Sequence, residues 1–388
     1  MPAPIKLIRI TTVPMALKYL LPGQMRYMAQ QGMQVVMISA DGEERADVIN
    51  TEQCPHIIVP FTRQITPIKD LACLWQLIKI FKKQQPDIVH THTPKAGLLG
   101  MLAAKICGIP VRIHTVAGLP LMVQTGLKLQ ILKAVEKITY AAATQVWPNS
   151  QSLLTYIKDN KYGKQEKLNI ISKGSSNGIN LQRFSKHALT DDILAEVKKS
   201  INYNPNNYYL LSIGRLVADK GIVELVLGFK DLLLQYPNLK LILVGKYETS
   251  LDPLPNDIIN EIKLNSCIIH IQWSAYVEYY LALANLFVFP SHREGFPNVL
   301  LQSAAMCTPI ICSAITGNVD IVTHNTTGLL FEKANIEAMK NNITFAINNP
   351  NSMHKMAAHL QATIHNYYDN KIIWQAIWQQ YQQLLTKH

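Results

Sequence analysis

The feature that most constrains the fold is an alternation of apolar runs with helix-like stretches, which stops once and then starts again. In the first half, apolar runs such as 5–10 and 34–39 are separated by stretches with apolar residues at helical spacing. The pattern weakens after Phe184, ends in the polar run 202–207 and resumes at Tyr209. Strands that are apolar throughout and alternate with helices are typical of a parallel sheet covered on both faces.

The two series predict an α/β protein with two Rossmann-like βαβ domains that face a cleft. With 388 residues the chain is long enough for two or three domains. We predict a first domain over 1–184, a linker over 185–207, a second domain over 208–366 and a terminal helix over 367–388. Helices of the first domain are predicted at 17–31, 69–83 and 96–107. Ligands of open α/β sheets bind beyond the carboxyl ends of the strands, which places a ligand in the cleft.

The chain shows no segment that predicts export or a membrane span. No stretch reaches the roughly 18 apolar residues that a span requires, and the charged N-terminus lacks the apolar core of a signal peptide. The six cysteines are scattered and form no Cys-x-x-Cys pair, so reduced thiols are expected. We therefore expect a cytoplasmic protein.

The net charge of +11 comes entirely from the first half, where residues 1–205 carry 25 Lys and Arg against 13 Asp and Glu, whereas residues 206–388 carry 12 against 13. A basic half suggests contact with a polyanion or an anionic membrane surface. Residues 69–83 favour contact with a membrane, because lysines flank an apolar stripe that contains Trp75 and Phe81. Residues 128–137 show a similar pattern. A core-facing stripe with solvated lysines on the outside is the alternative.

The first candidate site follows the strand that restarts the pattern. Residues 212–221 read Ser-Ile-Gly-Arg-Leu-Val-Ala-Asp-Lys-Gly, so Gly214, Arg215 and Lys220 stand between a strand and a helix start. A helix start favours anions because its N–H groups are free and its dipole is positive there. Arg supplies a forked pair of donors and Lys a mobile charge, so the pattern is typical of a phosphate site. A surface loop with two solvated cations is the alternative.

The second candidate site follows the apolar run 286–290. Residues 291–302 read Ser-His-Arg-Glu-Gly-Phe-Pro-Asn-Val-Leu-Leu-Gln, and a glycine turn before a helix forms a second anion nest. Glu294 would repel a phosphate, so we expect it to accept hydrogen bonds from sugar hydroxyls. A carboxylate that stabilises the helix dipole is the alternative.

Together the two motifs resemble the donor site of the retaining glycosyltransferases of family 4, which have the GT-B architecture. The resemblance covers nearly the whole chain and implies a terminal helix that crosses back onto the first domain. Segments 90–97 and 112–118 look like those of members that build bacterial capsule, exopolysaccharide or O-antigen. Further matching segments are 177–180 with 183–184, 316–318 with Asp320, and 325–330.

The resemblance implies transfer of a hexosyl or N-acetylhexosaminyl group from a nucleotide-diphosphate donor, above all a UDP-sugar, with retained configuration. The sequence contains no Asp-x-Asp, so a metal-independent reaction without a cofactor is expected, in which Arg215 and Lys220 neutralise the leaving diphosphate. Glu294 would orient the sugar. The donor-binding residues would be Gly214, Gly295, Phe296, Pro297, Asn298 and Gln302.

Gln302 departs from the family pattern, which usually carries Glu–x7–Glu across positions 294 and 302. A glutamine can still pair with the ribose, but without charge assistance. We expect weaker or differently selective donor binding. A degenerate, non-catalytic relative is the alternative.

In the first domain, the resemblance implies that His114 contacts the transferred sugar or its phosphate. A satisfied, half-buried histidine is the alternative. Gly23, Lys95 and Lys173 are predicted on the acceptor side. Family members of this type often use undecaprenyl-diphosphate-linked acceptors, which implies such a glycan as partner and a peripheral position on the inner face of the cell membrane.

Three other classes compete with a transferase. A dinucleotide-dependent oxidoreductase would need Gly-x-Gly-x-x-Gly after its first strand, where Gly23 stands alone. A nucleotide-sugar epimerase of the same architecture is only partly separated by the motifs. A nucleic-acid-binding protein would explain the basic half but leaves Arg215, Lys220 and Glu294 without a role, so no nucleic-acid partner is expected.

Overall fold

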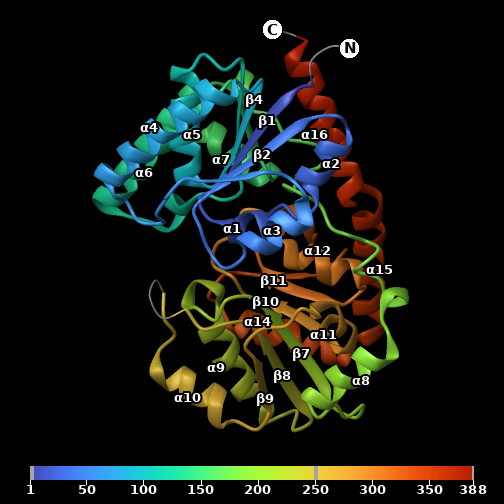
Figure 1. Cartoon of the computed structure of the whole chain (residues 1–388). Helices are drawn as coiled ribbons and strands as arrows, with labels where there is room; N and C mark the ends of the chain where they lie inside the picture. The colour runs from blue at the N-terminus through green and yellow to red at the C-terminus, as the bar shows by residue number, and fades with distance from the viewer. Residues whose placement is uncertain (1–3, 249–251, 387–388) are drawn as a thin grey trace. The chain divides into compact units, whose positions relative to one another are not determined.

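The computed structural model describes residues 4–248 and 252–386, which divide into two compact units. The first unit comprises Met1–Gly178 together with Asn370–His388, and the second comprises Ile179–Asp369. Each unit is built on a six-stranded parallel sheet with helices on both faces (Figure 1). The predicted α/β class with two Rossmann-like domains is confirmed.

The sheet of the first unit has the strand order β3-β2-β1-β4-β5-β6. Its strands are β1 (Lys6–Ile10), β2 (Gln34–Ser39), β3 (His56–Ile58), β4 (Ile88–His92), β5 (Val111–Val116) and β6 (Gln145–Pro148). The chain winds outward in one direction from β1 and in the other from β4, so the order reverses between these neighbours. Nearly every residue of β1, β4 and β5 is buried, which explains why these strands lack polar alternation.

Helices cover both faces of this sheet. They are α1 (Pro14–Leu20), α2 (Gln24–Gln30), α3 (Arg45–Glu52), α4 (Pro67–Gln84), α5 (Pro94–Ile106), α6 (Gly126–Ala142), α7 (Gln151–Asp159) and α16 (Asn370–Leu385). One apolar core joins α4, α5, α6 and α7 to one face, and a second core joins α1, α2, α3 and α16 to the other. Figure 1 shows α4, α5 and α6 grouped on one side of the strands and α2 and α16 on the other.

The single helix predicted at 17–31 is wrong, because the structure contains two helices there. Helix α1 ends at Leu20 and α2 begins at Gln24. Between them, Pro22 cannot donate a helical hydrogen bond, and Gly23 adopts a left-handed φ of 80°. The apolar spacing continues across this break, so periodicity alone did not reveal it.

The terminal helix α16 packs on the first unit. Ile373, Ile377 and Tyr381 are buried in the core that also contains Met25 and Met28 of α2. The indole of Trp374 donates a hydrogen bond of 2.6 Å to the side-chain oxygen of Asn177. Side chains along one face of α16 therefore complete the first unit.

The sheet of the second unit has the order β12-β11-β10-β7-β8-β9. Its strands are β7 (Tyr208–Ile213), β8 (Leu239–Val244), β9 (Ile268–Ile271), β10 (Leu286–Phe289), β11 (Ile310–Ser313) and β12 (Leu329–Phe331). Its helices are α8 (Asp191–Ser200), α9 (Ile222–Leu233), α10 (Asn256–Leu264), α11 (Val277–Leu283), α12 (Asn298–Ala305), α13 (Asn318–Ile321), α14 (Ile336–Asn348) and α15 (Pro350–Tyr367).

The segment 185–207, expected as a linker, lies within the second unit and contains helix α8. Two apolar residues one turn apart, Val197 and Ile201, attach this helix to the core of the second unit. Arg183, which was placed in the first domain, forms an ion pair of 2.8 Å with Glu278 of α11. The short apolar stripe of α8 is flanked by polar runs, which explains why the sequence pattern fades there.

Candidate active site in the second unit

The order of the second sheet reverses between β7 and β10, and both candidate motifs start at the carboxyl ends of these two strands. Lys220 comes from the loop after β7, and Glu294 comes from the loop after β10. The point where the strand order reverses is where open α/β sheets bind ligands. The topology therefore brings together two motifs that are about 80 residues apart in the sequence.

The ammonium group of Lys220 forms an ion pair with the carboxylate of Glu294. Both side chains are largely buried, with 19% and 13% of their surfaces exposed. The same carboxylate accepts a hydrogen bond of 2.8 Å from the hydroxyl of Ser291. Glu294 is thus held by one charged and one neutral donor, which fixes its orientation.

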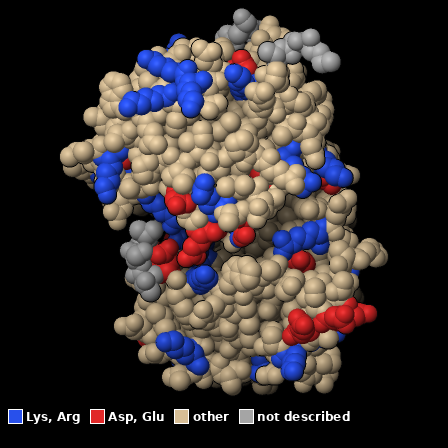
Figure 2. Space-filling view, viewed as in Figure 1, with Lys and Arg blue, Asp and Glu red and all other residues tan. Residues whose placement is uncertain are grey.

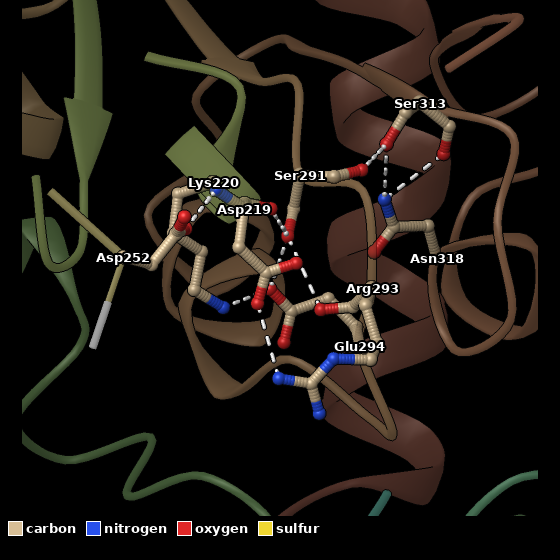
Figure 3. A network of polar contacts seen from close by, with 8 residues as sticks. All are labelled: Asp219, Lys220, Asp252, Ser291, Arg293, Glu294, Ser313 and Asn318. Atoms are coloured by element: carbon tan, nitrogen blue, oxygen red, sulfur yellow. Dashed lines mark hydrogen bonds and ion pairs between the residues drawn. The ribbon is translucent and has the colours of Figure 1, made fainter. Parts of the chain in front are cut away.

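Ser291 belongs to a chain of hydrogen bonds that crosses to the next strand. The Ser313 hydroxyl donates to the backbone carbonyl of Ser291, and the amide of Asn318 donates to the backbone carbonyl of Ser313 at 2.9 Å. All three side chains are buried. Figure 3 shows the contacts that link Asn318 through Ser313 and Ser291 to Glu294. This network makes the position of the Glu294 loop depend on the end of β11.

Arg293 adds a cation that the sequence motifs did not single out. Its guanidinium forms an ion pair of 3.0 Å with the carboxylate of Asp219, which directly precedes Lys220. The backbone N–H of Asp219 in turn donates to the carboxylate of Asp252 at 2.6 Å. Figure 3 shows that the Arg293 and Lys220 side chains approach the same group of carboxylates.

Two glycines allow the loops to approach each other. Gly221 has a φ of 68°, and an added Cβ would overlap the carbonyl oxygen of Pro290 at the end of β10. Gly317 has a φ of 85°, and an added Cβ there would overlap the carbonyl oxygen of Gly295. Any side chain at these positions would push the loops apart, so the sequence needs glycine at both.

The side chain of Arg215 is more exposed than that of Lys220 and lies farther from its carboxylate partner. Its guanidinium lies 3.7 Å from the carboxylate of Glu248, and half of its side-chain surface is exposed. It follows β7 by two residues, so it lies at the same edge of the sheet as Lys220. The second unit therefore presents Arg215, Lys220 and Arg293 at the carboxyl ends of two neighbouring strands.

The remaining predicted donor-binding residues surround the Glu294 turn and the start of α12. Gly214 lies directly after β7, Pro297 is the N-cap of α12, and Asn298 is its first residue. Gly295 is buried, with its carbonyl against Gly317. Gln302 is half-buried, one turn into α12.

Phe296 lies in the core of the second unit. It is 7% exposed, and its ring centroid lies 5.5 Å from that of Tyr368. Its packing anchors the turn that carries Glu294. A direct contact with the donor stays a prediction.

His292 and Glu224 form a further charged pair beside this site. The imidazole nitrogen lies 3.0 Å from the carboxylate of Glu224, on the first turn of α9. Hydrogen bonding to Glu224 raises the pKa of His292 above its usual value, against the effect of burial. Burial alone would raise the pKa of Glu224, but His292 lowers it overall. The contact thus joins the loop after β10 to α9.

His114 lies inside the first unit. It is 2% exposed, its Nδ1 lies 2.9 Å from the hydroxyl of Thr91, and the ring sits against Gly97 of α5. Burial lowers its pKa to about 3, and Arg9 adds to this effect, so the imidazole is neutral. The contact with Thr91 is of the kind expected in the alternative considered from the sequence, a satisfied, half-buried histidine, but the ring is buried more deeply than that alternative assumed. A contact between His114 and a sugar stays a prediction.

The residues predicted on the acceptor side occupy different surroundings in the first unit. The backbone N–H of Gly23 donates a hydrogen bond of 2.6 Å to the buried carboxylate of Glu52, so this N–H group already has a partner within the first unit. Lys95 forms an ion pair of 2.6 Å with Asp70 of α4. Lys173 lies exposed in the turn after Ile171. These three residues have different contacts, and their acceptor role stays a prediction.

Asp219, Ser291, Arg293, Ser313 and Asn318 were missed as site residues. The signal for Asp219, Ser291 and Arg293 was present, since they are neighbours of residues already singled out. Ser313 and Asn318 come from another strand and helix, and only the fold brings them to Glu294. Within 4–248 and 252–386, no group of three His, Cys, Asp or Glu side chains is arranged to hold a metal ion.

The chemical capacity of this site follows from its charges. Three cations at the switch point can bind a diphosphate and stabilise the charge that develops when it leaves. A carboxylate held in place by Lys220 and Ser291 can accept hydrogen bonds from hydroxyl groups. The combination suits a ligand with a diphosphate at one end and a polyhydroxyl group at the other.

Comparison with known proteins identifies the family. A family model described as glycosyl transferases group 1 matches residues 195–361, and one described as glycosyl transferase 4-like matches residues 12–150. The capsular polysaccharide biosynthesis glycosyltransferase CapM of Staphylococcus aureus is 33% identical over 383 residues, which cover 98% of each chain.

Two further relatives carry names that state donors or acceptors. The Escherichia coli UDP-Gal:α-D-GlcNAc-diphosphoundecaprenol α-1,3-galactosyltransferase is 27% identical and covers 72% of this chain and 71% of its own. The Campylobacter jejuni N,N'-diacetylbacillosaminyl-diphospho-undecaprenol α-1,3-N-acetylgalactosaminyltransferase is 24% identical and covers 75% and 76%.

Solved structures show the same architecture. A Rickettsia africae glycosyltransferase superposes with a TM-score of 0.80 over 99% of this chain and 100% of its own, at 19% identity. Anabaena HepE in complex with UDP superposes with a TM-score of 0.78 over 98% and 100%, at 16% identity. With a relative that is 33% identical along almost its whole length and both halves matched by transferase models, the chain belongs to the family 4-like glycosyltransferases of GT-B architecture.

Proposed function

We propose that the chain transfers a sugar from a UDP-sugar to a lipid-linked or saccharide acceptor in bacterial surface polysaccharide synthesis, with retained configuration. The observation that carries this proposal is the meeting of Lys220, Arg293 and Glu294 at the point where the strand order of the second sheet reverses. Cations and a carboxylate at that point match the two ends of a nucleotide-sugar.

Lys220, Arg293 and Arg215 would bind the diphosphate of the donor. Each contacts a carboxylate in the structure: Glu294, Asp219 and Glu248, respectively. A diphosphate offers more negative charge than any one of these carboxylates, so it competes for the same donors. Because these cations lie where charge develops on the leaving group, they stabilise the transition state more than the ground state.

Glu294 would orient the sugar rather than attack it. A carboxylate that accepts a hydrogen bond from the Ser291 hydroxyl is a weaker nucleophile than a free one, since its charge is partly neutralised. Its remaining lone pairs can accept hydrogen bonds from sugar hydroxyls. Retention then requires the acceptor to attack from the face that the diphosphate leaves, with a phosphate oxygen taking the proton of the acceptor hydroxyl.

The names of the relatives support the choice of substrates. The E. coli relative is named for UDP-Gal and an undecaprenol-diphosphate-linked acceptor, and the C. jejuni relative for transfer of N-acetylgalactosamine to an acceptor of the same kind. We propose a hexosyl or N-acetylhexosaminyl group as the transferred sugar and an undecaprenyl-diphosphate-linked glycan as the acceptor. The name of the S. aureus relative supports a place in capsule synthesis.

A donor and acceptor screen tests this function. Purified protein is given UDP-sugars and a short-chain lipid-diphosphate glycan, with and without EDTA, and UDP release and product are measured. We expect transfer that EDTA does not abolish, and proton NMR of the product should show the anomeric configuration of the donor. An inverted product would contradict the retaining mechanism, and a complete loss of transfer in EDTA would contradict the cation-only site.

Helix α4 supports a peripheral position on an anionic membrane. Among the described residues, no helix is long and apolar enough to cross a bilayer. Nevertheless Ile68, Leu71 and Trp75 lie on one face of α4 and are 88%, 55% and 59% exposed. Lysines lie near both ends of the helix, including Lys82 and Lys83 in its last turn. An exposed apolar face with flanking cations suits the surface of an anionic bilayer.

The exposed apolar face of α4 differs from the apolar stripe that the sequence led us to expect. Phe81, which was expected beside Trp75, is 1% exposed and belongs to the core of the first unit. The membrane-facing residues are therefore proposed to be Ile68, Leu71 and Trp75. Flotation with vesicles that contain phosphatidylglycerol should show binding that Trp75→Ala weakens. Phe345→Ala, at an exposed aromatic residue of α14, should leave binding unchanged. Equal binding by both variants would contradict the docking role of α4.

A further inference from the structure

Two contacts of the Glu294 carboxylate use the same oxygen atom, Oε1. The ammonium group of Lys220 pairs with this oxygen, and the hydroxyl of Ser291 donates a hydrogen bond of 2.8 Å to it (Figure 3). The other oxygen, Oε2, accepts no hydrogen bond within residues 4–248 and 252–386, yet it keeps accessible surface. Oε2 is therefore the oxygen with which a ligand can form a hydrogen bond.

The cations of this site are paired with carboxylates of the same unit. The pairs are Arg215 with Glu248, Lys220 with Glu294, and Arg293 with Asp219. Figure 2 shows acidic and basic side chains next to one another at this end of the second unit. A diphosphate that binds here draws the N–H donors of Lys220 toward its own oxygens. The hold of Lys220 on Oε1 of Glu294 therefore weakens when a nucleotide-sugar binds.

The Ser291 hydroxyl keeps its contact with Glu294 when the diphosphate is present. Ser291 is fully buried, so the diphosphate cannot reach its hydroxyl. The hydroxyl has a single proton, and it also lies near the backbone carbonyl oxygens of Arg293, at 3.2 Å, and Asp219, at 3.5 Å. The carboxylate of Glu294 is closer, at 2.8 Å, and it is charged, so it is the stronger acceptor.

The direction of the Ser291 side chain is restrained from the neighbouring strand β11. The Ser313 hydroxyl donates to the backbone carbonyl of Ser291, and the side-chain amide of Asn318 donates to the backbone carbonyl of Ser313 at 2.9 Å. All three side chains are fully buried. These contacts hold the backbone from which the Ser291 hydroxyl projects, so they keep that hydroxyl directed at Oε1 of Glu294.

We propose that Ser291 is a positioning residue of the transfer reaction. Its hydroxyl keeps Oε1 of Glu294 in place while Lys220 binds the diphosphate, and Oε2 accepts a hydrogen bond from a hydroxyl of the transferred sugar. The inference rests on the proposed function and adds to it a residue that touches neither the sugar nor the diphosphate. UDP has no sugar to be oriented, so its binding does not depend on Ser291.

A kinetic experiment uses this difference between UDP and the complete donor. With the UDP-sugar that the donor screen identifies, Ser291→Ala should lower the turnover number by about tenfold to 10²-fold, because the sugar is no longer held in the reactive orientation. The dissociation constant for UDP, measured by calorimetry, should stay at the wild-type value. A variant that was merely misfolded would lose UDP affinity together with turnover.

Ser303→Ala is the matched control. It also removes a fully buried serine hydroxyl from the second unit, one that donates at 3.3 Å to the backbone carbonyl of Thr308 in α12's C-terminal region. This hydroxyl has no contact with Glu294, so turnover and UDP affinity should both remain those of the wild type. Thermal unfolding of the two variants shows how much stability each hydroxyl contributes.

A crystal structure of the full chain with UDP tests the geometry without any turnover. We expect the ammonium group of Lys220 within hydrogen-bond distance of a phosphate oxygen and the Ser291 hydroxyl still on Oε1 of Glu294. The inference is overturned if Glu294 turns away from Ser291 in this complex, or if Ser291→Ala transfers sugar at the wild-type rate. A wild-type protein that uses no UDP-sugar would instead contradict the proposed function, and the role of Ser291 with it.

Discussion

Lys220 and Glu294 pair with each other although they follow different strands, β7 and β10, which are neighbours only because the order of the sheet reverses between them. The pair joins the residue expected to bind phosphate to the residue expected to bind sugar. A donor at this point would contact both, so the sugar would be oriented by a group whose position depends on the diphosphate-binding cation. Loss of one partner should therefore affect both functions.

Lys220→Ala should lower the turnover number by about 10²- to 10³-fold, the range seen when a single donor to a developing charge is removed. The measurement is UDP release at saturating donor. Lys230→Ala, which removes a lysine paired with Glu261 on the surface of the same unit, is the control and should keep normal turnover. Because the substitution also leaves a largely buried Glu294 without its cation, the thermal unfolding of both variants should be compared. A folded Lys220→Ala protein with normal turnover would contradict the assignment.

Gln302→Glu should lower the KM for the donor roughly three- to tenfold, because a carboxylate accepts charge-assisted hydrogen bonds from ribose hydroxyls where the amide accepts neutral ones. The half-buried position of Gln302 one turn into α12 leaves its side chain partly accessible. Donors with 2'- or 3'-deoxyribose are the control, since the gain should shrink when a hydroxyl is missing. An equal gain with deoxy donors would mean that residue 302 does not contact the ribose.

The strand positions could be predicted from the sequence because buried parallel strands leave continuous apolar runs. The predicted runs 5–10 and 34–39 correspond to β1 and β2. Helices were harder, because a helix such as α8 is attached by only a short apolar stripe. The break at Gly23 was also missed, since a proline and a left-handed residue interrupt a helix without disturbing its periodicity.

The candidate site was predictable only as far as it lies within short motifs. Lys220, Glu294 and their neighbours could be found because each motif follows a strand. The hydrogen bonds from Ser313 and Asn318 depend on β11 lying beside β10, which no local pattern indicates. The burial of His114 under Gly97 was likewise not visible, because it depends on how closely α5 packs on the sheet.

Gly221→Ala should destabilise the second unit through two effects that a control can separate. Gly108 has the same left-handed conformation as Gly221, with a φ of 69° against 68°, but nothing lies within 4 Å of a Cβ added there. Gly108→Ala is therefore the control. It should cost about 1–2 kcal/mol, the price of left-handed backbone for an L-residue. Gly221→Ala should cost about 1–3 kcal/mol more because of the overlap with Pro290. Hydrogen–deuterium exchange measures the loss of stability in the first unit for Gly108→Ala and in the second unit for Gly221→Ala. Equal losses would contradict the close approach of the two loops.

Glu136→Gln should change how the stability of the first unit depends on pH. Burial raises the pKa of Glu136 from 4.5 to about 7, against the effect of Tyr140. The folded protein therefore holds the proton of the Glu136 carboxyl more tightly than the unfolded chain does. The contribution of this group to the free energy of unfolding is complete below pH 4.5 and is lost as the pH rises to 7. The loss amounts to about 3 kcal/mol at most. The variant cannot ionise, so its stability relative to the wild type should increase between pH 5 and pH 8. Chemical unfolding of both proteins at these two values measures the difference. A constant difference would show that the Glu136 carboxyl is ionised in the folded protein at pH 5, contrary to its burial.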